Sequence, residues 1–96
     1  MRSSSNKVVL LLGRIVATPG ALAELEQAGQ KVDEFLRRHE CGDWGEVQEE
    51  DWAANDRALQ SGERVLSSYR LKSGEPIWIV TEADRSSTTL LLPSEY

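Results

Sequence analysis

Apolar and polar residues alternate in short blocks over the last third of the chain. Residues 77–81 and 88–92 are apolar runs rich in Ile, Val, Leu and Thr, and a charged connector, residues 82–87, separates them. Side chains of these types favour a pleated, half-buried surface, and a polar break between two such runs is typical of a hairpin. The pattern predicts a rigid hairpin with charged residues at one end, where sites are often placed.

A third β-rich run, residues 64–71, comes before this hairpin and is joined to it by a Lys-Ser-Gly-Glu turn signal. The connections are short, so this run and the strands predicted over 77–81 and 87–92 are expected to form an antiparallel meander. Side chains alternate between the two faces of a strand, which predicts that Ser67 and Tyr69 share a face.

The N-terminal part begins with a polar stretch, residues 1–6, that we expect to be a flexible tail. Residues 7–17 are a nearly continuous apolar run, which predicts a strand that is at least partly buried on both faces. Gly13 interrupts the run and marks either a bulge or a close approach of two backbones. The pattern does not decide which edge of the sheet this strand joins.

The first helix is predicted over 19–28, with Leu22 and Leu25 on one face. Thr18 is a favourable N-cap and Pro19 suits the first helical position. Gly29 is well placed to end the helix.

A second helix is predicted over 30–39, because four residues recur at the spacing of one helix face. These residues are Val32, Phe35, Leu36 and His39. A third helix is predicted over 49–60, with Trp52, Asn55, Asp56 and Leu59 on one side. Asp43 and Glu46 have the spacing of a capping box, so either a short turn or this helix begins there.

The element order indicates an α+β domain, β-ααα-βββ, with the helices on one face of an antiparallel sheet. Residues 7–96 form a single domain on this interpretation. A 96-residue chain buries a modest core, which favours a dimer or a partner.

The net charge of −5 argues against non-specific binding to nucleic acid or to an anionic membrane, which requires a basic surface. The single cysteine, Cys41, excludes an intrachain disulfide and indicates a reducing compartment. The apolar run 8–12 is too short to span a membrane or to act as a secretory signal. We therefore expect a cytoplasmic protein.

An acidic stretch, residues 40–56, holds seven carboxylates, no Lys or Arg, and the tryptophans Trp44 and Trp52. Its first interpretation is a solvated acidic face anchored by tryptophan, and the alternatives are a protein-binding surface or a divalent cation site. The calcium-loop pattern is absent, and neither metal nor cofactor is expected. The candidate binding residues are Asp43, Trp44, Glu46, Asp51, Asn55, Tyr69 and Asp84.

His39, Cys41 and Asp43 resemble a ligand trio or a cysteine nucleophile beside its base. Zinc sites usually take four ligands in paired motifs, and the chain has no second Cys or His. His39 lies on the apolar stripe near the end of its helix, where it can bond carbonyl groups. A structural role is therefore favoured.

Charged and hydroxyl residues gather around the hairpin: Arg64, Ser67, Tyr69, Glu82, Asp84, Arg85, Thr88 and Thr89. Glu82 and Arg85 suit a general acid–base residue and a phosphate- or oxyanion-stabilising residue. The alternative is a turn held by backbone bonds of Asp84 and Ser86 and by an exposed ion pair. We favour the turn.

The segments LGRIVATPGAL, FLRRHECGDWGEV, EDWAANDRAL, RVLSSYRL and IWIVTEADRSSTTLLLPSEY cover most of the chain. Together they resemble a family of small bacterial proteins from plasmids and integrated mobile elements, some labelled type I restriction endonuclease subunit M. The family has no established function. A methyltransferase subunit needs a larger cofactor-binding domain and a glycine-rich loop after a strand. Cys41 and Trp52 fall outside the family pattern, which weakens a thiol or metal role for Cys41.

The expected function is an accessory module that binds another protein or itself, without enzymatic activity. The alternatives are an acidic antirestriction protein and a small ribonuclease, with Glu82 as base, His39 as acid and Arg64 and Arg85 on the phosphate. The geometry of His39 discriminates between these functions. An open cleft with His39 next to Glu82 or Arg85 favours the enzyme, and a His39 buried beneath Phe35 favours binding.

Overall fold

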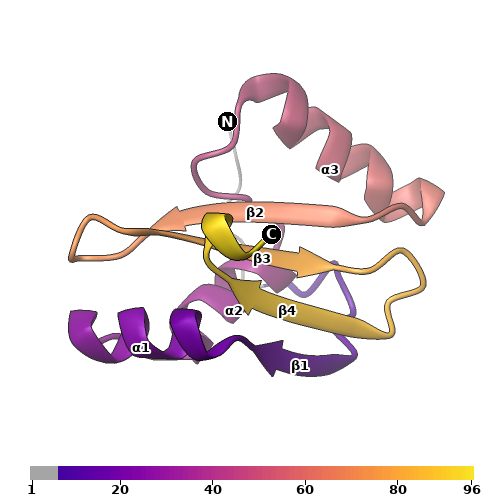
Figure 1. Ribbon diagram of the computed structural model, residues 1–96. Helices are drawn as coiled ribbons and strands as arrows, with labels where there is room; N and C mark the ends of the chain where they lie inside the picture. Colours follow the sequence, from indigo (N-terminus) through magenta and orange to yellow (C-terminus); the bar gives the residue numbers. More distant parts are fainter. Residues whose placement is uncertain (1–6) are drawn as a thin grey trace.

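The computed structural model describes residues 7–96, and the predicted tail, residues 1–6, lies outside this range. Four strands, three α-helices and a C-terminal 3-10 turn follow one another along the chain (Figure 1). In order they are β1 (Arg14–Ala17), α1 (Pro19–Ala28), α2 (Val32–Glu40), α3 (Glu49–Ser61), β2 (Val65–Arg70), β3 (Pro76–Thr81), β4 (Ser87–Leu91) and η1 (Pro93–Glu95).

The strands form one mixed sheet in the order β1-β4-β3-β2. Strands β2, β3 and β4 pair antiparallel, which confirms the predicted meander. Strand β1 joins the β4 edge and runs parallel to β4, with Ile15 opposite Thr88. The α+β class is confirmed, but the sheet is mixed and not purely antiparallel.

The first strand is much shorter than predicted. Residues 7–13 are not strand, and the backbone amides of Val9 and Leu10 bond the carbonyl of Glu40 at the end of α2. Gly13 has a φ of 64°, and a Cβ there would overlap the carbonyl oxygen of Arg85. The close approach expected at Gly13 is confirmed. Its left-handed backbone ends the extended run, which is the reason for the short strand.

Helix α1 has the predicted bounds. The Thr18 hydroxyl accepts a bond from the Ala21 amide at 3.1 Å, and Gly29 closes the helix with a φ of 68°. Helix α2 begins two residues later than predicted, because the amide of Gln30 bonds the carbonyl of Leu25 and belongs to the end of α1.

No helix begins at the predicted capping box. The Asp43 carboxylate accepts a bond from the Gly45 amide at 3.1 Å, so this segment is a turn. Helix α3 begins at Glu49, after Gln48.

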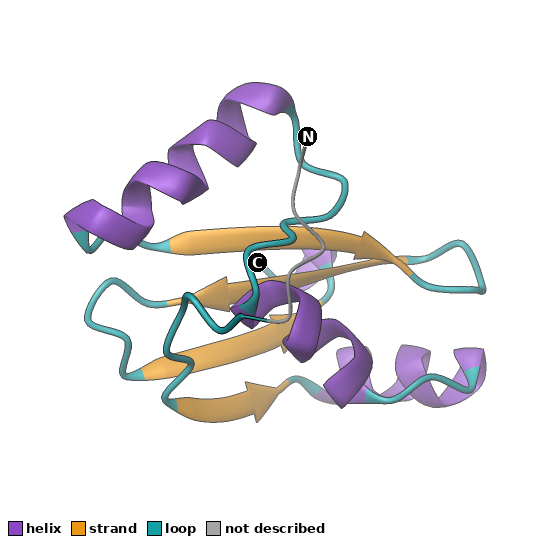
Figure 2. Cartoon of the chain, turned by 180° about the vertical axis from the view of Figure 1, so that it is seen from behind, coloured by secondary structure: helices purple, strands orange, loops and turns teal. Residues whose placement is uncertain are grey.

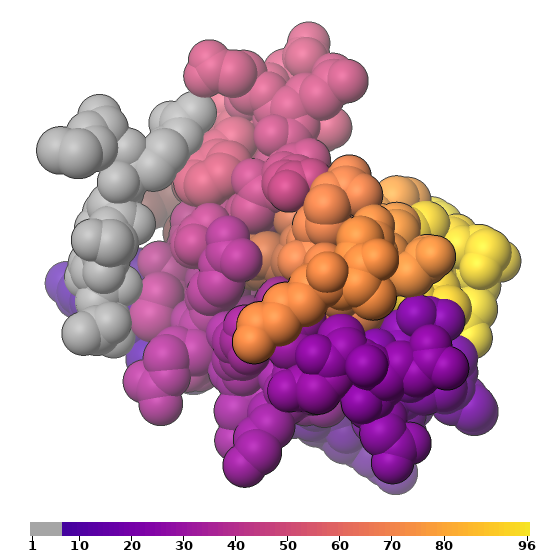
Figure 3. Space-filling view, turned by 90° about the vertical axis from the view of Figure 1, so that its left-hand side faces the viewer, coloured from indigo at the N-terminus to yellow at the C-terminus, as the bar shows by residue number. Residues whose placement is uncertain are grey.

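Helices α1 and α2 pack on the same face of the sheet, and η1 lies across the opposite face (Figures 1 and 2). Helices α1 and α2 share one core with the sheet side of the chain, which consists of Ala21, Leu25, Phe35, Tyr69, Leu71, Ile77, Ile79 and Leu90. Figure 3 shows the β2–β3 turn lying against this layer, where the Lys72 amide bonds the Gln30 side chain at 2.9 Å.

Helix α3 does not join this layer. It flanks the β2 edge of the sheet, where Ala58 packs with Trp44, Val65 and Leu10 in a second core cluster. The helices are therefore divided between one face and one edge, in contrast to the predicted arrangement on a single face.

Candidate functional site

His39 is fully buried on the inner side of α2, in contact with hydroxyl groups of the sheet. Its Nδ1 lies 2.5 Å from the Ser67 hydroxyl and its Nε2 lies 2.9 Å from the Thr81 hydroxyl. The edge of its ring faces Trp44 at 5.6 Å between centroids. These partners replace the helix carbonyls that the sequence suggested for His39.

The hydrogen bonds of this cluster have one consistent direction. The Thr88 hydroxyl donates to the Leu12 carbonyl at 2.7 Å, so its oxygen accepts the proton of Thr81, 2.7 Å away. Thr81 has then used its own proton, and Nε2 of His39 must donate to it. Because burial keeps the imidazole neutral, its Nδ1 carries no proton and accepts from the Ser67 hydroxyl.

Burial lowers the pKa of His39 to about 3, and the positive charge of Arg85 acts in the same direction. A serine hydroxyl bonded to a histidine resembles an activated nucleophile. Here Ser67 and His39 are both fully buried, and both ring nitrogens have protein partners. Among residues 7–96, no buried side-chain polar atom is left without a hydrogen bond. The geometry is that of a satisfied core network.

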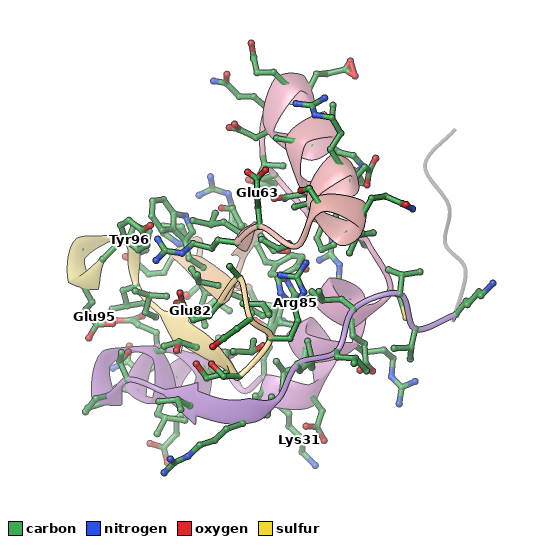
Figure 4. All side chains as sticks on the ribbon, turned by 90° about the vertical axis from the view of Figure 1, so that its right-hand side faces the viewer. Lys31, Glu63, Glu82, Arg85, Glu95 and Tyr96 are labelled. Carbon is green, nitrogen blue, oxygen red and sulfur yellow. The ribbon has the colours of Figure 1, made fainter. Side chains whose placement is uncertain are left out.

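The rim of the β3–β4 hairpin carries an exposed polar cluster (Figure 4). Arg64 lies 3.2 Å from the Glu82 carboxylate and donates to the Tyr96 hydroxyl at 2.8 Å. The negative charge of Glu82 raises the pKa of Arg64. Both partners of the ion pair are about half exposed, a setting in which such pairs contribute little to stability.

Arg85 stabilises the end of α3. Its guanidinium donates to the carbonyls of Ala58 at 2.8 Å, Glu63 at 2.7 Å and Glu82 at 3.2 Å. Its own backbone is left-handed, with a φ of 61°. These three backbone carbonyls thus occupy donors that a phosphate would need.

The hairpin connector is a turn of the predicted kind in one respect. Asp84 accepts a bond from the Ser86 amide at 3.0 Å. The predicted ion pair between Glu82 and Arg85 does not form, because Glu82 pairs with Arg64. Thr89 is half-buried on the strand that follows.

The four candidate catalytic residues are not brought together. His39 is sealed beneath the sheet, Glu82 and Arg64 pair at the surface, and Arg85 caps a helix. His39 has no exposed surface from which a substrate could be reached.

Three of the candidate binding residues make hydrogen bonds or ion pairs within the protein. Trp44 is fully buried and donates its indole N–H to Asp56 at 2.9 Å. Tyr69 is also buried and donates to the Asp43 carbonyl at 2.6 Å, while the Asp43 carboxylate pairs with Arg38 at 2.8 Å. Burial raises the pKa of Tyr69.

Asn55 closes the outer edge of β2. Its amide group donates to the Leu66 carbonyl at 2.8 Å, and its oxygen accepts from the Leu66 amide at 3.3 Å. The side chain therefore replaces a neighbouring strand.

Glu46, Asp51 and Asn55 also border a groove of about 480 Å³ between α3 and the outer face of the sheet. The groove is lined by Glu46, Val47, Gln48, Asp51, Ala54, Asn55, Leu66, Ser68 and Trp78. Figure 3 shows α3 standing above the β2–β3 hairpin on this side. The groove brings together residues of the acidic stretch between Glu46 and Asn55.

Trp78 is the groove residue that sequence reasoning missed. It lies between Ile77 and Ile79, both fully buried, so alternation along β3 directs it to the opposite face. Its ring packs edge-on against Tyr96, with centroids 5.4 Å apart. The alternation could have identified it, because a large aromatic residue out of phase with the core marks the outer face.

Among residues 7–96, no three His, Cys, Asp or Glu side chains are placed to hold a metal ion together. Within the same range, no helix combines the length and apolar character needed to cross a bilayer. No protein-family model, curated protein or solved structure matches the chain.

Proposed function

We propose that this protein is a protein-interaction module that binds a basic segment of a partner through the groove between α3 and the outer face of the sheet. The observation that carries the proposal is the combination of an aromatic floor, Trp78, with an acidic border at Asp51 and Glu46. The resemblance to mobile-element proteins extends the proposal to an accessory protein of such an element.

A lysine or arginine side chain fits the chemistry of the groove. A cation over an indole face gains about 0.5–1 kcal/mol at an exposed site, and carboxylates at the border add attraction. Glu46 is already paired with Arg70 at 3.3 Å, so Asp51 is the main acceptor. The net charge of −5 also steers basic partners toward the molecule.

The groove has a suitable size for one or two side chains rather than for a large folded surface. Its volume of about 480 Å³ lies within the usual range for ligand sites, roughly 300–1,000 Å³. We therefore expect weak binding of a short extended segment.

The test is a titration of the full chain with an arginine–glycine repeat peptide, followed by NMR shifts of the Trp78 indole. We expect Asp51→Asn to weaken binding by about threefold to tenfold, the effect of losing one charge contact at about 1 kcal/mol. Glu50→Gln removes a neighbouring acid of α3 that does not line the groove, and it should bind as the wild type does.

If both variants lose affinity equally, the peptide responds only to the overall charge of the protein, and the groove is not the binding site. A glutamate–glycine peptide should leave the indole signal in place.

A small ribonuclease is the competing function. It requires His39 to reach a substrate, which its burial opposes. We expect the protein to leave a fluorogenic RNA intact. Cleavage that Glu82→Gln abolishes at an unchanged melting temperature would favour the enzyme instead.

A further inference from the structure

The two edges of the sheet differ in how their backbone groups are used. At the β2 edge, the Ser68 amide donates to the Trp44 carbonyl at 3.1 Å, and the Glu46 amide donates to the Ser68 carbonyl at 2.6 Å. Asn55 bonds both backbone groups of Leu66. Gly45 permits this approach, because a Cβ there would overlap the Ser68 carbonyl. This edge is closed to another strand.

The β1 edge is open. Among residues 7–96, β1 pairs only with β4. The amides of Arg14 and Thr18 bond the carbonyls of Ser86 and Leu90, both at 3.0 Å, so alternate residues of β1 face β4. Ile15 and Ala17 therefore direct their N–H and C=O groups away from the sheet. Figure 1 shows β1 at the margin opposite α3.

Apolar side chains flank this open edge on both faces. Ile15 is 43% exposed and Val16 is 41% exposed, although successive side chains of a strand point to opposite faces. Natural proteins usually protect an edge strand with charges, proline or a bulge. Below Ile15 lies a shallow hollow of about 220 Å³ that Leu12 and Leu36 also line.

The charges near β1 balance. Asp33, Arg37 and Glu40 border the hollow, and Arg14 lies on the strand itself. This gives two positive and two negative groups in a chain of net charge −5. The acidic residues of α3 lie at the other edge of the sheet. A second copy can therefore approach β1 without strong like-charge repulsion, whereas the acidic α3 side would repel its own copy.

We propose that two copies of this chain associate through antiparallel pairing of β1 with β1, which joins their sheets into one. A two-fold axis beside Val16 sets Ile15 of each copy opposite Ala17 of the other. Residues that direct both backbone groups outward form the hydrogen-bonded pairs of an antiparallel ladder. Pro19, which lacks an N–H, and the left-handed Gly13 limit the pairing to this short strand.

The pairing is expected to be weak. Stable interfaces bury roughly 1,200–2,000 Å², and a strand of four residues supplies a fraction of this area. Ile15 and Val16 add apolar contact, so we expect a dissociation constant on the order of 10–100 µM. The groove at the β2 edge stays open in this dimer, which makes the inference independent of the proposed function.

The first test is sedimentation equilibrium of the full chain across a concentration range of about three decades. The mass should rise from 10.7 kDa toward twice that value. Ile15→Lys should keep the protein monomeric. Leu22→Lys replaces an equally exposed apolar residue on α1, 49% exposed, and should leave the association unchanged.

Amide hydrogen exchange provides a second test that needs no variant. Protection of the Ile15 and Ala17 amides should rise about tenfold at high concentration, the ratio expected when about nine-tenths of the chains are paired. The Val16 amide, which faces β4, should keep its protection.

A protein that stays monomeric throughout the range would overturn the proposal. A dimer whose Ile15 and Ala17 amides exchange as fast as in the monomer would also overturn it, as would equal effects of the two lysine variants.

Discussion

At the residue scale, His39 shows how the interior holds an ionisable group neutral. The chain of donors from Ser67 through His39 to Thr81 and Thr88 ends on the Leu12 carbonyl. A proton added to Nδ1 would place a buried positive charge near the positive Arg85 and would require the Ser67 hydroxyl to turn and accept from it. The network therefore favours neutral histidine.

This network predicts that acid destabilises the protein through His39. The unfolded chain binds a proton at the ordinary pKa of 6.5, and the folded protein does so at about 3. Between these values the unfolded state binds more protons, so the free energy of unfolding falls by about 1.4 kcal/mol per pH unit as the pH decreases. Urea denaturation at several pH values measures this slope.

The variant His39→Gln isolates the contribution of His39 from that of the carboxylates. It should unfold about 2–4 kcal/mol more easily near neutral pH, because buried hydroxyls lose partners. The difference from the wild type should shrink as the pH falls from 6.5. Parallel stability curves for the two proteins would contradict the role assigned to His39.

At the element scale, Arg85 connects the hairpin rim to the end of α3. Gly62 closes α3 with a left-handed φ of 80°, and Arg85 bonds the nearby carbonyls of Ala58 and Glu63. The connector between β3 and β4 thus adds a second donor to the Ala58 carbonyl, which also accepts from the Gly62 amide at 2.9 Å, and a donor to the Glu63 carbonyl just beyond the helix.

We expect Arg85→Ala to lower the free energy of unfolding by about 1–3 kcal/mol, because charge-assisted bonds to the carbonyls of Ala58, Glu63 and Glu82 are lost. Amide exchange in the last turn of α3 should accelerate. Glu82→Gln changes the same turn but removes an exposed ion pair, and it should cost less than about 1 kcal/mol. Equal losses in chemical denaturation would refute the capping role of Arg85.

At the scale of the whole molecule, the C-terminal turn η1 ties distant parts of the chain together. The Glu95 carboxylate accepts bonds from the Thr18 hydroxyl at 2.6 Å and from the Leu92 amide at 2.8 Å. Thr18 is also the N-cap of α1. The carboxylate therefore lies at the positive end of a helix, where an anion is favoured.

The hydroxyl of Thr18 lowers the pKa of Glu95, with the Leu92 amide as a second cause. Because the folded pKa is below the unfolded value, the tie stabilises the fold above the unfolded pKa and is lost as the pH falls through the folded pKa. An NMR titration should show a higher Glu95 pKa in Thr18→Val. Thr18→Ser retains the hydroxyl and should keep the pKa low. An unchanged Glu95 pKa in Thr18→Val would show that the bond between Thr18 and Glu95 does not form in solution.

The elements with strong local signals were predicted well. Helix α1 has the predicted bounds because Thr18, Pro19 and Gly29 act within one turn of it. The meander is confirmed, since its strands alternate and its turns are short. Residues 7–13 were misassigned to a strand, because Leu10 packs against Trp44 and not in the sheet.

The candidate binding residues lie in different parts of the structure. Glu46, Asp51 and Asn55 came from the acidic stretch, and the structure brings them to one groove. Trp44 and Tyr69 were assigned to a surface but are buried, because aromatic residues near acids also anchor loops to the core. Trp78 was missed, although it alternates along β3 with the buried Ile77 and Ile79.

The sequence by itself determined the helices and the alternating strands, because these follow from interactions within a few residues. It also determined the net negative charge, which follows from composition. The tertiary structure alone decided the parallel placement of β1 beside β4, which leaves one edge open while Asn55 closes the other. It also decided the partners of His39, which come from Ser67 and Thr81. These features depend on contacts between residues far apart in the chain, and local sequence patterns do not predict such contacts.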